Sequence, residues 1–204
     1  MAELMTATSY VDTPRTTSRL IAAWRGIKPV RRLQALAALL ASLGIAALAT
    51  IAVPTASAIV IGIVGLLAGA VAVVDLHEHH IPNRLLLLGV VAVTIGATIG
   101  SIVSDERIAG EVLIGLLVAA FPLFAIRYGH GLAMGDIKMA AVLGAAGGLI
   151  HPFVGLGTVF VAALSSGVFA LVHNRTRLAL GPWLWAGFGA ACTVGIAFVR
   201  LRGH

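Results

Sequence analysis

Long stretches of this sequence are apolar and contain no charged residue. Five such stretches cover 33–52, 58–74, 85–103, 152–172 and 178–199; a sixth, 108–126, contains one acid, and a short seventh covers 139–150. A helix needs about 20 mostly apolar residues to cross a bilayer, and lipid-exposed backbone must be helical or form a closed barrel. The stretches lack the apolar–polar alternation of barrel strands. We therefore predict an all-α fold, a polytopic transmembrane bundle of six to seven helices.

The composition excludes a water-soluble protein, because 59% of the residues are hydrophobic and 11% are charged, against about 25% charged in soluble domains. We expect one transmembrane domain over residues 33–204 and a flexible, basic cytoplasmic tail over residues 1–32. In the short stretch 139–150, Gly144 and Gly148 have the spacing of small residues that lets two membrane helices approach closely.

The basic residues act as topology signals, since they cluster at the ends of the apolar stretches. Cytoplasmic loops are enriched in Lys and Arg, and six basic residues precede the first stretch: Arg15, Arg19, Arg25, Lys28, Arg31 and Arg32. With helices alternating from a cytoplasmic N-terminus, eleven Lys and Arg lie inside and three outside. If the short stretch 139–150 does not cross the membrane, the last two helices have the opposite orientation in the membrane. We expect a multi-pass protein of the inner (plasma) membrane. Its expected partner is the lipid bilayer, and we expect it to bind no nucleic acid.

Two aspartates are candidates for a catalytic site among the eight carboxylates. Asp75 follows the second stretch and Asp136 precedes the short one, so the predicted topology places both on the cytoplasmic side. Ionisable residues at membrane helices are functional candidates. Considered alone, each aspartate also has a purely structural explanation. Asp75 would be a solvated residue at a helix end, and Asp136 would be an N-terminal helix cap.

A close pair of aspartates shares one proton, and this supports a definite reaction. The ionised carboxylate takes a proton from a water molecule, the protonated one polarises a peptide carbonyl, and water attacks directly. The substrate is then a peptide that enters or lies beside the membrane. Other nucleophiles compete poorly, because Ser165, Ser166 and Cys192 lie within apolar stretches without an obvious base. No phosphate loop or dinucleotide-binding glycine motif is present, so we expect no cofactor.

Three segments resemble the type IV prepilin peptidase family: VVDLHEHHIPNRLLLL, AMGDIKM and ALGPWLWAG. The resemblance implies a membrane aspartic endopeptidase of the Gly-x-Gly-Asp class, in a short form without the N-terminal methyltransferase domain. Such enzymes cut prepilin-like substrates at the cytoplasmic face, between a basic leader and an apolar helix. By this resemblance Asp75 and Asp136 are the catalytic pair, and the motif-supporting residues are Ile81, Pro82, Asn83, Ala133, Gly135 and Lys138.

Two departures from the family pattern stand out. Ala133 replaces the first glycine of the Gly-x-Gly-Asp motif and loses the backbone freedom of glycine. The link after Asp75 reads His77-Glu78-His79-His80, where relatives often have arginines. His77 and His80 have a spacing that could hold a metal on a helix, but we favour a solvated loop that tunes local charge and expect no metal. The side chain of Lys138 is expected to point away from Asp136 and towards lipid headgroups.

Three other functions remain open at this point. A presenilin-type intramembrane protease shares the glycine–aspartate motif, but usually has tyrosine where this chain has Val74. A proton-coupled membrane carrier would use Asp75 and Asp136 as proton or ion sites. A catalytically inactive pilin-assembly protein would be consistent with Ala133.

Overall fold

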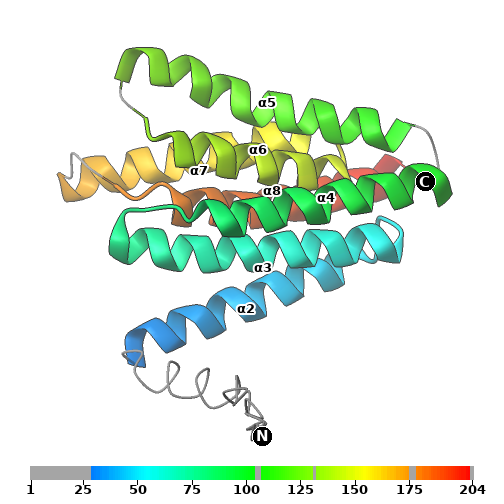
Figure 1. The fold of residues 1–204 in the computed structure, drawn as a ribbon, viewed down its shortest axis with the longest axis horizontal. Coiled ribbons are helices and arrows are strands. Elements are labelled where there is room, and N and C mark those ends of the chain that lie inside the picture. The colour runs from blue at the N-terminus through cyan, green and yellow to red at the C-terminus, as the bar shows by residue number, and fades with distance from the viewer. Residues whose placement is uncertain (1–28, 104–106, 131, 175–177, 203–204) are drawn as a thin grey trace, which may run out of the picture.

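The computed structural model describes residues 29–103, 107–130, 132–174 and 178–202. These residues form seven helices and no strand, which confirms the predicted all-α bundle (Figure 1). The helices are α2 (Pro29–Ala49), α3 (Thr55–Glu78), α4 (Asn83–Val103), α5 (Arg107–His130), α6 (Met134–Gly148), α7 (Phe153–His173) and α8 (Gly181–Arg202). Most of the predicted tail, residues 1–28, lies outside the described part of the chain.

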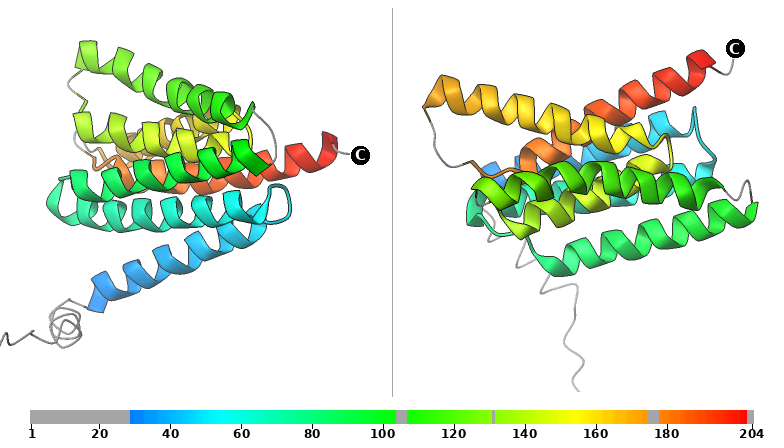
Figure 2. Two further views of the ribbon diagram at one scale, coloured as in Figure 1. Left: turned by 45° about the vertical axis from the view of Figure 1, so that its right-hand side comes forward. Right: turned by 90° about the horizontal axis from the view of Figure 1, so that it is seen from above.

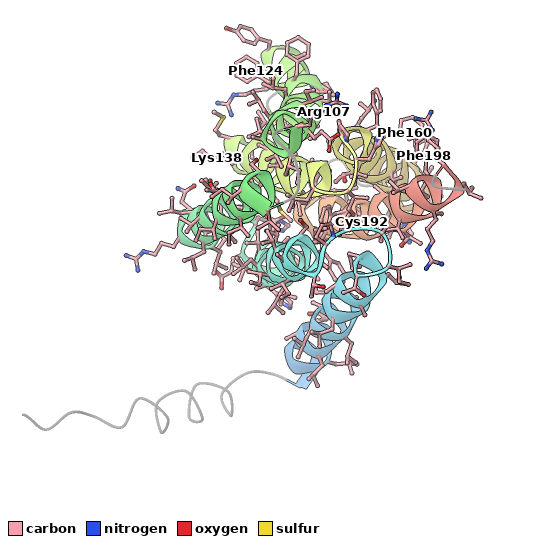
Figure 3. The ribbon with its side chains drawn as sticks, turned by 90° about the vertical axis from the view of Figure 1, so that its right-hand side faces the viewer. Arg107, Phe124, Lys138, Phe160, Cys192 and Phe198 are labelled. Carbon is pink, nitrogen blue, oxygen red and sulfur yellow. The ribbon has the colours of Figure 1, made fainter. Side chains whose placement is uncertain are left out.

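Five of these helices, α3, α4, α5, α7 and α8, are long and apolar enough to cross a membrane. Helix α2 adds a shorter apolar stretch, Leu33–Ala49. Helix α6 has only 15 residues, or about 22 Å at 1.5 Å per residue. It lies in the middle of the bundle when the helices are viewed end-on (Figure 3), and eleven of its residues are buried. The short helix is therefore a core element that the five long helices surround.

Helix α6 packs closely against α5 because glycines line the contact. A Cβ atom added to Gly148 would lie 2.6 Å from the carbonyl oxygen of Glu111 and 2.6 Å from the Cα of Val112. A Cβ atom on Gly144 would meet Ala119 and the backbone of Gly115. The close approach predicted from the spacing of Gly144 and Gly148 is confirmed.

The helices alternate in direction, so that α3, α5 and α7 end where α4, α6 and α8 begin (Figures 1 and 2). We call this the Asp end, because it contains Asp75 and Asp136. Although short, α6 reaches the opposite end, where Gly148 meets the first turns of α5. There, His151 packs against Phe198 near the end of α8, with ring centroids 5.5 Å apart. Within the bundle, α7 and α8 thus keep the alternating order of helix directions.

Candidate active site

Asp75 is buried in the last turn of α3, with 5% of its surface exposed. The apolar run ends at Val74, but the helix continues to Glu78, because no residue before His79 interrupts it. His79 has left-handed backbone angles (φ 48°, ψ 36°), and its N–H donates to the carbonyl oxygen of Asp75 at 2.9 Å. The turn at His79 therefore places the Asp75 side chain at the edge of the bundle without exposing it.

The carboxylate of Asp75 is held by the start of α8. The backbone N–H of Gly181, 106 positions away in sequence, donates to Asp75 Oδ2 at 2.9 Å. A Cβ atom on Gly181 would lie only 2.7 Å from the same oxygen. Glycine therefore allows this close approach, and the positive end of the α8 dipole faces a carboxylate.

Asp136 is buried in the first turn of α6, with 8% of its surface exposed. The residue before the helix, Ala133, has φ −67° and ψ 141°, and its carbonyl oxygen accepts the N–H of Asp136 at 3.2 Å. These are ordinary extended angles that any residue adopts. The position therefore does not require the backbone freedom of the glycine that the family motif has there.

The two aspartates line one pocket of about 290 Å³ at the Asp end. The pocket lies between the start of α4, the start of α6 and the segment that leads into α8. The other lining residues are His79, His80, Ile81, Asn83, Ala133, Met134, Gly135, Lys138, Leu178, Ala179 and Leu180. Apart from Pro82, which directly precedes α4, every sequence-predicted site residue thus lines this pocket.

Asp136 lies outside the five long spans, and its environment favours the protonated carboxyl. Burial raises the pKa of Asp136 from 3.8 to about 6, and the nearby charge of Asp75 adds to the increase. A carboxyl with this pKa holds its proton below about pH 6. The pocket thus places an acid that can donate a proton beside a second carboxylate.

The supporting motif residues join the start of α4 to the start of α6. A Cβ atom on Gly135 would lie 3.0 Å from the Cβ of Ile81, so glycine lets α6 pack against the link that follows Asp75. Lys138 Nζ donates a hydrogen bond to Asn83 Oδ1 at 3.3 Å. This bond places the Lys138 ammonium at the start of α4, while the side chain remains exposed.

A comparison with known families agrees with this geometry. The model of the type IV leader peptidase family matches residues 60–173, more than half of the chain. The chain belongs to the type IV leader peptidase family. No curated protein and no solved structure matches it. The matched residues include both aspartates but end before α8, so the contact between Gly181 and Asp75 lies outside the family match.

The histidine-rich link of this leader peptidase family member divides into two parts. His77 belongs to α3, and its Nδ1 lies 2.8 Å from the carbonyl oxygen of Val73, whereas His79 and His80 line the pocket. Within the described ranges, no three His, Cys, Asp or Glu side chains are grouped so that they could hold a metal ion. The two pocket histidines are thus neighbours of the aspartates.

Sequence reasoning did not assign Gly181 to the site, although the segment ALGPWLWAG was recognised as a family-like helix start. The available signal was a glycine directly before Pro182, because proline is favoured in the first turn of a helix. That signal locates the start of α8 but does not identify Asp75 as the group that the helix start contacts.

Proposed function

We propose that this membrane peptidase is an aspartic endopeptidase that removes leader peptides from type IV prepilin-like substrates. The observation that carries this proposal is that Asp75 and Asp136, 61 positions apart, are both buried and line one pocket. Burying two carboxylates costs free energy, so buried ionisable residues in a membrane protein are candidates for a functional site. A shared proton lowers this cost and provides the acid and the base of peptide hydrolysis.

The two carboxyl groups take different roles in the proposed reaction. Asp136 carries the shared proton, because burial and the charge of Asp75 raise its pKa. Asp75 acts as the base and takes a proton from a water molecule, whose oxygen attacks the peptide carbonyl carbon. Asp136 gives its proton to the carbonyl oxygen. Collapse of the tetrahedral intermediate breaks the C–N bond, the proton on Asp75 passes to the leaving amine, and one hydroxyl of the intermediate returns a proton to Asp136 as the C=O bond re-forms, in the manner of aspartic proteases.

The position of the pocket suits a substrate that is cut where its polar leader meets its apolar helix. The pocket lies at the ends of long apolar helices, so its level in the membrane is that of the lipid–water boundary. A peptide bond at the start of a membrane helix would lie at the same level. A bond in the middle of a membrane helix would lie well away from both aspartates.

The distribution of charge supports a site that faces the cytoplasm of an inner membrane. Arg84, Arg127 and Lys138 lie at the Asp end, and Arg107, Arg200 and Arg202 lie at the opposite end. Eight further Lys and Arg residues come before α2 in the sequence, lie at its start, or come between α7 and α8 in the sequence; α2 begins and α7 ends at the Asp end. The excess of basic residues is therefore on the side of the two aspartates, as the positive-inside rule requires of the cytoplasmic side.

Co-expression with a prepilin-like subunit tests the proposal, with leader removal read as a mass shift. Wild type should cleave, whereas Asp75→Asn and Asp136→Asn should each abolish cleavage. Glu78→Gln is the matched control, because Glu78 is an exposed acid one turn from Asp75 that does not line the pocket; this variant should cleave normally. Cleavage that survives both Asp→Asn changes would exclude the aspartate pair as the catalytic centre.

A further inference from the structure

A second, larger cavity runs along the side of the bundle between α4 and α5, with α6 as its floor. It is a groove of about 880 Å³ with a mostly apolar lining. Leu86, Val90 and Ala97 of α4 line one wall, Val112 and Leu116 of α5 line the other, and Ala145 of α6 is part of the floor. In the end-on view, Lys138 points out from α6 between α4 and α5, at this opening (Figure 3).

The groove adjoins the aspartate pocket. Asn83 and Lys138 line both cavities, and the hydrogen bond between their side chains lies at the junction. An extended peptide that leaves the pocket at this junction would enter the groove directly. The junction is also where the polar surroundings of the two aspartates change to an apolar surface.

The groove is as long as one membrane-spanning helix. Its lining on α4 extends from Asn83 at the Asp end to Ile102 near the opposite end, which is about 28 Å at 1.5 Å per residue and close to the roughly 30 Å hydrocarbon core of a bilayer. The hydroxyl groups of Thr94 and Thr98 in this wall donate to backbone carbonyl oxygens of α4, at 2.9 Å each. These two side chains thus need no polar partner from an occupant of the groove.

We propose that this groove binds the apolar helix that follows the leader in the substrate, with the substrate helix parallel to α4. The inference rests on the proposed function, because the cleaved bond must lie at the two aspartates. The helix that continues from this bond must then pass into the membrane from the junction at Asn83 and Lys138. The groove begins at this junction and continues for the length of such a helix, so one of its faces packs against α4, α5 and α6.

Disulfide cross-linking at defined depths tests the docking. The chain has a single cysteine, the buried Cys192, so Cys192→Ala provides a cysteine-free background. Asp75→Asn in this background retains uncleaved substrate. The probe is a single-span peptide with a Lys- and Arg-rich leader that ends in glycine, followed by a Leu and Ala helix of about 20 residues. Each version of the probe has one cysteine in the helix.

The proposed register predicts which pairs form. Thr98 is fifteen residues after Asn83 and lines the groove, so Thr98→Cys should cross-link to a cysteine about fifteen residues into the probe helix, roughly 22 Å deep. Val90→Cys should instead prefer a cysteine about seven residues in, roughly 10 Å deep. Ile99→Cys is the matched control, because Ile99 is 44% exposed but does not line the groove. Its yield should be several-fold lower than that of Thr98→Cys.

Equal yields at Thr98 and Ile99, or yields that do not depend on the depth of the probe cysteine, would overturn the docking proposal and indicate a groove filled by lipid. Cleavage of the same probe by the Cys192→Ala enzyme with both aspartates intact is measured in parallel. Cleavage without a groove cross-link would retain the peptidase and reject the groove. Cross-linking in register without cleavage would retain the groove and reject the aspartate mechanism. Absence of both results would reject both proposals.

Discussion

Gly181→Ala should impair leader cleavage while the helix bundle stays folded. The Gly181 N–H holds Asp75 Oδ2 at 2.9 Å, and a Cβ atom on residue 181 would lie 2.7 Å from that oxygen. Ordinary contacts of a Cβ atom begin at 3.4 Å, so the oxygen must move by about 0.7 Å, the difference between these two distances. The side chain of Asp75 is the part that can move, because the neighbouring backbone is helical.

The expected loss follows from this displacement. A hydrogen bond to a charged group contributes about 1.5–3 kcal/mol, and each 1.4 kcal/mol corresponds to a factor of ten in rate, so its weakening accounts for roughly a 10- to 100-fold decrease in kcat. Misplacing a reacting group by about 1 Å has a similar effect. KM should change little, because Gly181 does not line the pocket or the groove.

The assay compares kcat, KM and the thermal unfolding midpoint in detergent for the wild type and two variants. Gly167→Ala in α7 is the matched control, because a Cβ atom there would meet nothing within 4 Å. It should cleave like the wild type and unfold at the same or a slightly higher temperature, since alanine is the better helix former. If Gly181→Ala has the wild-type kcat and an unchanged unfolding midpoint, the catalytic role of Asp75 does not depend on its contact with the start of α8.

Three further outcomes are expected. The kcat/KM for leader cleavage should fall as pH rises through about 6, because Asp136, whose raised pKa keeps it protonated below that pH, then loses the shared proton; a flat pH–rate profile would contradict this. Ala133→Gly should leave kcat nearly unchanged, because φ at this position is −67°; a large gain in kcat would contradict it. Gly148→Ala should destabilise the fold by about 1–3 kcal/mol, because its Cβ would meet the Glu111 backbone, whereas Gly110→Ala, with nothing within 4 Å, should not lower the unfolding midpoint.

The helices were predictable because membrane spans are read from hydropathy, a property of single segments. The observed helices extend beyond the predicted apolar stretches where polar residues continue the helix. Helix α3 runs four residues past Val74 to Glu78, because charged and polar residues do not end a helix by themselves. It ends where His79 takes left-handed angles, two residues before the Ile81-Pro82 pair. Helix α2 likewise starts at Pro29, four residues before its apolar run.

The contacts that build the site were less predictable, because they depend on neighbours far apart in sequence. Local helix geometry predicts that Lys138 and Asp136 point apart, but it does not identify Asn83, 55 positions away, as the hydrogen-bond partner of Lys138. Trp185 is a similar case. A tryptophan near a helix end suggests an interfacial anchor, but its indole N–H donates to the carbonyl oxygen of Gly65 at 3.1 Å, inside the bundle. In both cases the partner is set by how the helices pack.

Helix starts help to explain how the Asp end holds two buried carboxylates. Three helices, α4, α6 and α8, begin there, and the start of a helix carries partial positive charge from unpaired N–H groups. Asp75 lies against the start of α8, and Asp136 lies in the first turn of α6. Because α6 runs from the Asp end to the opposite end of the bundle and α7 returns, α8 begins at the Asp end, where Gly181 contacts Asp75.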